Sequence, residues 1–449
     1  MTRHIAGTCA AILVCATSAL TAAPIEVSDT TLGNGLRVVV YENHTAPTAS
    51  VQVWYRVGSY FEPGGYTGMS HLLEHMMFQG TKKYGSGKYS DLIEAQGGRE
   101  NAFTSDNYTV YWAELASDRY ELELGLEADR MANLLLDSVE FERERNVVME
   151  ERRLGENTPY NSLWQEFSAT AYMTHTYRNP VIGWMGDLEN LKRSDLLRHY
   201  QTYYTPSNAV LVVAGDVQPH KVFSQAVKYF GAIKAHPVPA WRPTELPQQG
   251  ERRFVIRKDI STPALMLGYH VPGTDNPDFY AFELLEGLLM RGMTSRLYAR
   301  LVYQGGKAMS IWGGNDAEGS LGLFYFFALP RTPGLQDTLE QMIYAELESL
   351  KTTPVRDSEL LRVKNQVVSD FVYRQDDARG VGHGIGQSLT MHGSLDYLNT
   401  YPDRVSAVTR EDIMRVAAKY FKDDNRTVGR VVPTGVTPPG AKMTGRGER

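Results

Sequence analysis

Two histidines that lie four residues apart, with a glutamate between them, are the residues of this chain best suited to chemistry. They form the segment His71-Leu72-Leu73-Glu74-His75. On a helix, residues i and i+4 share one face, so both imidazoles can reach one metal ion. The order is the reverse of the commoner zincin motif, and in both orders the glutamate can reach a metal-bound water. The segment predicts zinc-dependent hydrolysis; the alternative is a pair of satisfied core histidines.

A catalytic zinc ion takes three protein ligands and keeps one position open for water, so two histidines are not enough. The residues around the motif favour a short helix that starts near Thr67 or Ser70 and stops at Gly80. The best source of a third ligand is a second predicted helix, over residues 140–154, whose Glu144 and Glu151 share one face. A solvated surface helix is the alternative for this charged segment.

The first residues have the layout of a cleaved secretory signal. Residues 1–23 contain Arg3, an apolar run and small residues at their end, so we expect a periplasmic or secreted protein. An uncleaved anchor is the alternative, but no second apolar run of ~20 residues follows, and we expect no membrane span in the mature chain. Both cysteines, Cys9 and Cys15, fall in this segment, so the exported chain would have neither a disulfide nor a thiolate ligand.

The charge of the chain argues against one class of partner, and its length indicates more than one domain. The formal net charge is −6 and the charges are mixed along the chain, which argues against a nucleic-acid partner. A mature chain of about 425 residues is too long for one ordinary core. A proline-rich stretch, which we place at residues 236–250, reads as a linker near the midpoint.

The chain repeats itself on either side of this linker. Alternating segments at residues 48–58 and 262–272 predict strands that are offset by 214 residues, and further helix-strand pairs lead to residues 208–213 and 427–432. The simplest account is two homologous α+β domains. We place them at residues 24–235 and 251–435, with a flexible tail at residues 436–449.

The second half has lost the metal motif. Carrying the two histidines and the glutamate forward by 214 residues lands on Leu285, Leu288 and Leu289. The helix is therefore expected twice and the metal site once.

These features resemble the pitrilysin/insulinase family of inverted-motif (HxxEH) zinc metallopeptidases, in particular its small two-domain bacterial type, which is similar to mitochondrial processing peptidase beta. Besides the motif and the Glu144-x6-Glu151 pair, three further segments carry the resemblance in order: Gly97-Gly98 before Asn101-Ala102-Phe103-Thr104-Ser105, Tyr177-x-x-Pro180-Val181-Ile182-Gly183, and residues 204–216. The match runs from about residue 30 to residue 435.

The resemblance implies a role for each site residue. His71, His75 and Glu151 would bind one zinc ion per chain, and Glu74 would be the general base that takes a proton from water. Glu144 would orient a ligand or the water, with a plain surface acid as its alternative. The fold would be two α+β domains, each a mixed or antiparallel sheet packed against helices, that form half of a clam-shell chamber.

The resemblance also places the peptide substrate. Asn101, Ala102 and Phe103 precede a predicted strand over residues 108–115. In the family this region is an exposed sheet edge on which a peptide adds as an extra strand. An ordinary buried strand is the alternative.

One part of the chain departs from the family. Single-chain and homodimeric members have an arginine and, seven residues later, a tyrosine that hold the substrate, and Val302 and Met309 fill those places here. Neither side chain can donate a hydrogen bond to an oxyanion. We therefore favour a zinc-bearing subunit of a heterodimer, whose homologous partner supplies the arginine and tyrosine, over a peptidase that works weakly alone.

The expected function is an exported zinc endopeptidase acting on peptides or unfolded polypeptide segments. The alternative from a different class is a non-catalytic or weakly active scaffold subunit of a larger complex; retention of every metal-site residue argues against it. A mitochondrial presequence processor is disfavoured because the N-terminal segment has only one arginine.

Overall fold

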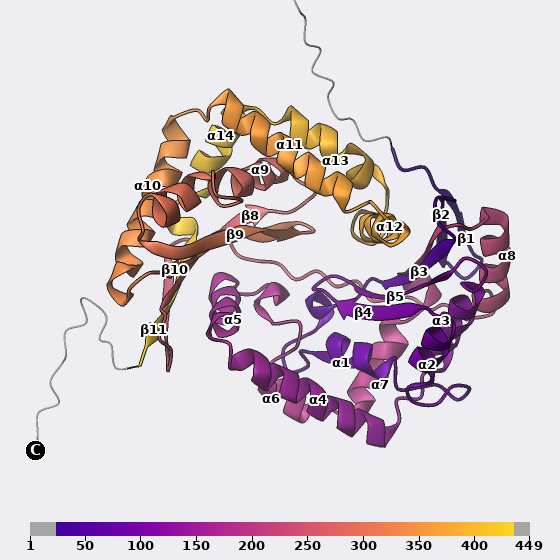
Figure 1. The fold of residues 1–449 in the computed structure, drawn as a ribbon. Helices are drawn as coiled ribbons and strands as arrows, with labels where there is room; N and C mark the ends of the chain where they lie inside the picture. Colours follow the sequence, from indigo (N-terminus) through magenta and orange to yellow (C-terminus); the bar gives the residue numbers. More distant parts are fainter. Residues whose placement is uncertain (1–23, 435–449) are drawn as a thin grey trace, which may run out of the picture.

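The computed structural model describes residues 24–434, which form two sheets, each flanked by helices (Figure 1). The expected signal segment and C-terminal tail lie outside the described residues. The strands of the first sheet are β1 (Ser28–Thr31), β2 (Arg37–Glu42), β3 (Thr48–Tyr55), β4 (Arg99–Thr104), β5 (Thr109–Ala116) and β6 (Ala209–Gly215). Those of the second are β7 (Arg252–Lys258), β8 (Ala264–Pro272), β9 (Ala308–Glu318), β10 (Leu321–Pro330) and β11 (Arg426–Pro433). The α+β prediction is confirmed.

Five strands follow the same order in the two sheets, and the first sheet has β1 in addition. The first has the order β1-β2-β6-β3-β5-β4 and the second β7-β11-β8-β10-β9, so that β4 and β9 are the corresponding edge strands. Each sheet contains one parallel pair, β2 with β6 and β7 with β11, and is otherwise antiparallel. The repeat inferred from the alternating segments is thus present in the strand order of the fold.

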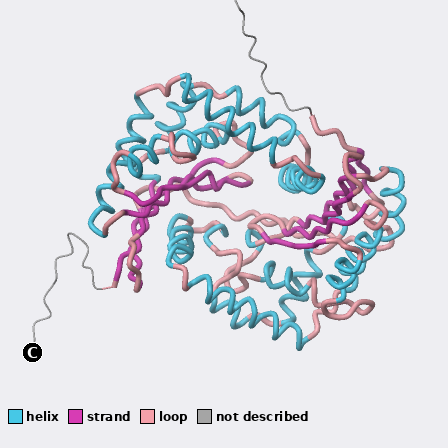
Figure 2. The backbone as a smooth tube through the Cα atoms, in the orientation of Figure 1, coloured by secondary structure: helices cyan, strands magenta, loops and turns pink. Residues whose placement is uncertain are grey.

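Helices cover both sheets, as Figure 2 shows by colour. In the first half they are α1 (Met69–Met76), α2 (Lys88–Ala95), α3 (Glu121–Asn133), α4 (Ser138–Glu156), α5 (Pro159–Ala171), α6 (Met185–Asn190), α7 (Arg193–Tyr203) and α8 (Pro219–Phe230). In the second half they are α9 (Phe279–Leu289), α10 (Gln336–Thr352), α11 (Asp357–Tyr373), α12 (Ala378–His392), α13 (Asp396–Ala407) and α14 (Arg410–Tyr420). Each half has one large hydrophobic core, in which its sheet packs against its own helices.

Each half also lends one helix to the sheet of the other half. Helix α12 packs on β3 and β6 of the first sheet, while α5 packs on β8 and β11 of the second. The approach of α12 requires a glycine, because a Cβ at Gly386 would lie 2.2 Å from the ring of Trp54. This exchange covers the central strands of both sheets and ties the halves together.

The segment between the halves is held at several points although residues 231–251 contain neither helix nor strand. The indole of Trp241 donates a hydrogen bond to the Tyr60 carbonyl at 2.6 Å. The carboxylate of Glu245 accepts backbone N–H groups of residues 173–175. Gln248 donates to the Arg426 carbonyl of β11 at 2.7 Å.

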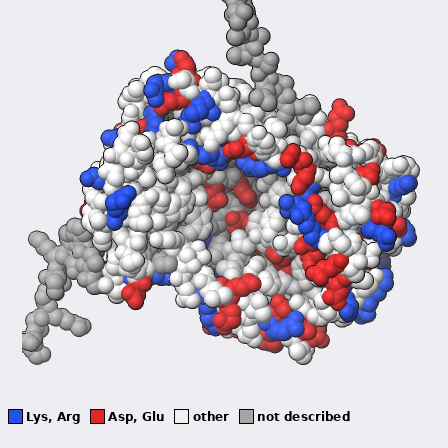
Figure 3. All heavy atoms as spheres, viewed as in Figure 1, with Lys and Arg blue, Asp and Glu red and all other residues white. Residues whose placement is uncertain are grey.

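The space-filling view shows a hollow in the face between the two halves, with acidic side chains in its wall (Figure 3). Within residues 24–434, no helix combines the length and the apolar character needed to cross a bilayer.

Candidate metal centre

Helix α1 carries the HxxEH motif, and a buried carboxylate fixes its first turn. The helix starts at Met69 after Gly68, whose φ of +87° is in the left-handed region. The side chain of Glu62, which is fully buried, accepts the N–H groups of Gly68 at 2.7 Å and Ser70 at 2.6 Å. Burial raises the pKa of Glu62 to about 7.

The expected start of the helix is confirmed, because Met69 lies between Thr67 and Ser70, whereas the expected stop at Gly80 was wrong. Neither Thr67 nor Ser70 caps the helix through its side chain, because the carboxylate of Glu62 accepts the free N–H groups of the first turn instead. At the other end the helix stops at Met76, and the turn that follows tightens through a hydrogen bond from the Phe78 N–H to the His75 carbonyl at 3.1 Å. Gly80 lies beyond this turn.

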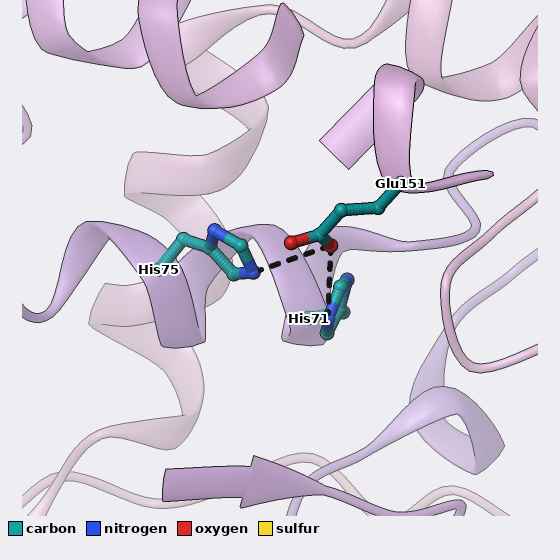
Figure 4. A group of neighbouring side chains, drawn as sticks. All are labelled: His71, His75 and Glu151. Carbon is teal, nitrogen blue, oxygen red and sulfur yellow. Dashed lines mark ion pairs between the residues drawn. The ribbon is translucent and has the colours of Figure 1, made fainter. Parts of the chain in front are cut away.

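Three side chains converge where the two helices α1 and α4 face each other (Figure 4). The Oε2 atom of Glu151 lies 3.6 Å from Nε2 of His75 and 3.9 Å from Nε2 of His71. One ligand atom from each residue lies within 4.8 Å of the others. The imidazoles are 19 % exposed and the Glu151 carboxylate 42 % exposed, so the group is open on the side of Glu151.

This group has the ligand types and spacing of a zinc site. Two imidazole nitrogens and one carboxylate oxygen are a common donor set for catalytic zinc, and they leave a position open. Burial, and to a lesser extent the neighbouring His75, lowers the pKa of His71 to about 4, so its imidazole is neutral and able to bind a cation. The side chains therefore fit a zinc ion.

Helix α4 brings a second carboxylate to the back of His75. Asp137 caps this helix by accepting the N–H of Val139 at 2.8 Å, and the helix continues to Glu156, beyond the expected residue 154. Oε2 of Glu144 lies 3.3 Å from Nδ1 of His75. With the proton on Nδ1, the lone pair of Nε2 is directed toward the metal position.

The pairing of α1 with α4 is braced by the residue next to Glu151. The buried guanidinium of Arg152 donates to the Gly183 carbonyl at 2.5 Å and lies over the ring of Trp184. Gly183 in turn lies against Thr67 and Gly68, where a Cβ at residue 183 would be 2.5 Å from the Thr67 carbonyl oxygen. Arg152 therefore links the helix that carries Glu151 to the start of the helix that carries the histidines.

Glu74 is held by a hydroxyl from the edge strand. Thr104 Oγ1 donates to Glu74 Oε2 at 2.6 Å. Burial raises the pKa of Glu74, and the Thr104 hydrogen bond opposes that rise. A carboxylate with a raised pKa is suited to take up a proton at neutral pH.

The proposed substrate residues lie on β4, the last strand of the first sheet. Ala102 packs toward the core that includes α1, whereas Phe103 packs toward α12. Asn101 is exposed. The strand is not the ordinary buried one considered as an alternative, because its outer edge has no partner among the described strands.

The second half contains no counterpart of the metal ligands at the equivalent positions. Leu285, Leu288 and Leu289 lie on α9, all buried. Val302 lies in a π-helix over Tyr298–Tyr303, and Met309 is exposed on β9.

Three residues that contact the site were not predicted from the sequence: Glu62, Thr104 and Arg152. For Thr104 a signal was present, since it is two residues from Ala102 and must share its face of the strand. The partner of Arg152 is a backbone carbonyl 31 residues further along the chain, for which the sequence has no signal. The partners of Glu62 are six and eight residues away, a spacing that the capping rules do not cover.

Comparison with known proteins identifies two family models in the chain. Residues 37–184 match the model for insulinase, peptidase family M16, and residues 190–367 match the model for the peptidase M16 inactive domain. His71, His75 and Glu151 lie in the first region, and the three leucines at the positions equivalent to the HxxEH motif lie in the second.

Similar proteins cover almost the whole chain. The zinc protease PqqE of Helicobacter pylori is 34 % identical over 406 residues, which are 88 % of this chain and 90 % of that protein. Mitochondrial-processing peptidase subunit beta of Mus musculus is 27 % identical over 91 % of this chain and 85 % of its own length. The crystal structure of a protease from Helicobacter pylori superposes with a TM-score of 0.88 at 32 % identity, covering 92 % of this chain and all of that one.

Proposed function

This chain belongs to the insulinase family, peptidase family M16, and we propose that it is an exported zinc-dependent endopeptidase that hydrolyses peptides or unfolded polypeptide segments. The relatives named zinc proteases support a zinc peptidase. The observation that carries the proposal is the convergence of His71, His75 and Glu151 beside Glu74. The proposal that the chain is exported rests only on the resemblance of residues 1–23 to a secretory signal.

Each residue of the centre has a task in this proposal. His71, His75 and Glu151 hold one zinc ion, which when bound acidifies a water and polarises the scissile carbonyl. Glu74 takes a proton from the water and later delivers it to the leaving amine. Thr104 fixes the rotamer of Glu74 through its 2.6 Å hydrogen bond. Glu144 fixes the tautomer of His75.

The substrate binds in extended form along the free edge of β4. Hydrogen bonds between the substrate backbone and the backbone of residues 101–103 would accept many substrate sequences, because they involve no substrate side chain. A peptide in that place runs past Glu74, since the hydroxyl of Thr104 on the same strand contacts its carboxylate. Most strands of a folded protein already pair their backbone groups with neighbouring strands, which favours peptides and unfolded segments as substrates.

A homologous partner would complete the site. Val302 and Met309 offer no hydrogen bond donors to a developing oxyanion, and loss of a single such donor costs about 10² to 10³ in rate. Similarity to mitochondrial-processing peptidase subunit beta, a subunit by its printed name, supports the same arrangement. Mixing the chain with the product of an adjacent related gene should raise kcat about 100-fold; full activity of the isolated chain would exclude a required partner.

The peptidase proposal is tested with Glu74→Gln. Zinc content and hydrolysis of a quenched fluorescent peptide are measured for wild type, Glu74→Gln and the control Glu150→Gln, whose carboxylate is 65 % exposed and paired with Arg153. We expect zinc in all three and a rate that falls at least 100-fold only in Glu74→Gln. Equal rates in wild type and Glu74→Gln would reject Glu74 as the base. Zinc without hydrolysis in the wild type, alone and with the partner, would favour the scaffold alternative.

A further inference from the structure

A cavity of about 610 Å³ lies on the face of β4 that is turned toward α12. Its floor is the first sheet, and its other walls are α12 and the helices α11 and α13 of the second half. Asn101, Ala102 and Phe103 of the edge strand line it. The metal centre lies on the opposite face of this strand, where Thr104 contacts Glu74.

The strand register fixes which side chains face the cavity. Gln52 of β3 pairs with Trp112 of β5, and Trp112 pairs with Asn101 of β4. These three residues form one row across the sheet, and all three line the cavity. A peptide strand added beyond β4 would extend this row by one residue, with its side chain about 5 Å from that of Asn101.

Side chains alternate between the two faces of a strand. A substrate residue opposite Ala102 or Thr104 points toward α1 and Glu74. Its two immediate neighbours in the substrate therefore point toward α12 and the cavity. The cavity is thus placed to read residues that flank the one facing the metal centre.

Two arginines, Arg374 and Arg379, are the cationic side chains that line the cavity. Arg374 and Tyr397 both line it, and no hydrogen bond from the guanidinium or from the hydroxyl is found among the described residues. Arg379 lies over the ring of Trp112 at 4.9 Å, and its Nε is buried without a hydrogen bond, 3.6 Å from Glu114.

Glu283 is the single carboxylate among the residues that line the cavity, and the charge of Arg374 acts on it. Glu283 accepts hydrogen bonds from Asn315 at 3.0 Å and from the Tyr401 hydroxyl at 2.6 Å. The imidazole of His383 stacks on Phe103 with ring centroids 5.7 Å apart. Burial, and then Arg379 and Arg374, lower its pKa to about 4, so it adds no positive charge at neutral pH. The free capacity of the cavity is for an anionic acceptor next to aromatic walls.

We propose that this cavity is a substrate subsite that selects an acidic side chain, aspartate or glutamate, next to the residue held at the metal centre, with Arg374 as its main anion-binding group. The inference rests on the proposed peptidase function and on binding of the substrate along β4. It adds a preference that neither the metal motif nor the edge strand determines.

The test uses peptide sets that differ at a single position. Quenched fluorescent peptides carry aspartate, asparagine or lysine at successive positions around the cleaved bond, and kcat/KM is measured for wild type, Arg374→Glu and Arg374→Gln. The control is Arg331→Glu, an exposed arginine on the loop after β10 that does not line the cavity. Circular dichroism and thermal melting establish that each variant is folded.

We expect wild type and Arg331→Glu to prefer aspartate over lysine by about 10- to 100-fold at one or both flanking positions, the range of a charge-assisted hydrogen bond. Arg374→Gln should reduce this preference, and Arg374→Glu should reverse it. An unchanged preference in Arg374→Glu, or equal rates for aspartate and lysine in the wild type, would overturn the proposal.

A binding measurement separates failure of the subsite from failure of the peptidase proposal. Fluorescence anisotropy gives the Kd of the aspartate and lysine peptides for Glu74→Gln, alone and combined with Arg374→Glu. A preference for aspartate that reverses with Arg374→Glu supports the subsite even if the wild type cleaves nothing, alone or with the partner, a result that would reject only the peptidase proposal. Binding without a charge preference rejects the subsite even if the wild type is an active peptidase.

Discussion

Replacement of Thr104 by valine removes one contact from Glu74 and leaves the three metal ligands intact. The hydroxyl donates to the carboxylate at 2.6 Å, the length of a charge-assisted O–H···O⁻ bond. Such a bond contributes about 1.5–3 kcal/mol. If it is needed to hold Glu74 in its catalytic rotamer, kcat should fall by about 10- to 150-fold, since 1.36 kcal/mol is a factor of ten in rate.

The assay is steady-state hydrolysis of a quenched fluorescent peptide together with zinc titration. Thr104→Val should lower kcat, leave KM within about twofold and leave zinc affinity unchanged, because the hydroxyl contacts the base and none of the ligands. Thr104→Ser keeps the hydroxyl and should restore most of the rate. Thr202→Val is the control, because its hydroxyl also donates a hydrogen bond, to the Arg198 carbonyl on α7.

Two results would refute this reasoning. Thr104→Val with the kcat of the wild type would show that the hydrogen bond does not position Glu74. Thr104→Ser as impaired as Thr104→Val would show that the loss reflects the shape of the edge strand instead of the hydroxyl.

Three further predictions concern the ligands, the pH dependence and the joining of the halves. Glu144→Gln should weaken zinc binding about 10- to 100-fold in a chelator competition, and unchanged affinity would contradict its contact with the ligand imidazole. Burial lowers the pKa of His199 to about 3, so the folded state disfavours protonation of this imidazole. The free energy of unfolding should therefore fall by up to ~1.4 kcal/mol per pH unit as the pH drops below ~6.5 toward 3. Urea unfolding of His199→Gln at pH 7 and pH 5 should show a smaller loss than the wild type, and equal losses would contradict this assignment. Gly386→Ala places a Cβ 2.2 Å from Trp54 and should destabilise the chain by about 1–3 kcal/mol in thermal melting, unlike Gly334→Ala, which has open space around it.

Local patterns predicted the strands and the helices that carry the chemistry. The alternation over residues 48–58 became β3, and the charged segment with Glu144 and Glu151 became α4. Both depend on neighbours in sequence, and the i, i+4 and i, i+7 rules then decide which side chains share a face. The structure brings Glu151 to the two histidines, as the resemblance implied.

Contacts between distant segments could not be predicted in this way. Nothing near Gly386 in sequence indicates that its helix packs on Trp54 of the other half. The cap that Glu62 provides for α1 replaces the local serine or threonine that capping rules favour. The partner of Gly386 is selected by the tertiary fold, which a single sequence does not record. Glu62 instead lies six and eight residues before the N–H groups that it accepts, outside the spacing of the known capping motifs.

The central claim is that His71, His75 and Glu151 together bind the catalytic zinc ion. Anomalous diffraction at the zinc absorption edge, from crystals of protein that cleaves peptide in solution, tests it most directly. The account predicts one peak per chain, coordinated by these three side chains, and no peak at that position in Glu151→Gln crystals or one of much lower occupancy. A zinc peak elsewhere in the chain, or active crystals with no peak at this site, would contradict it.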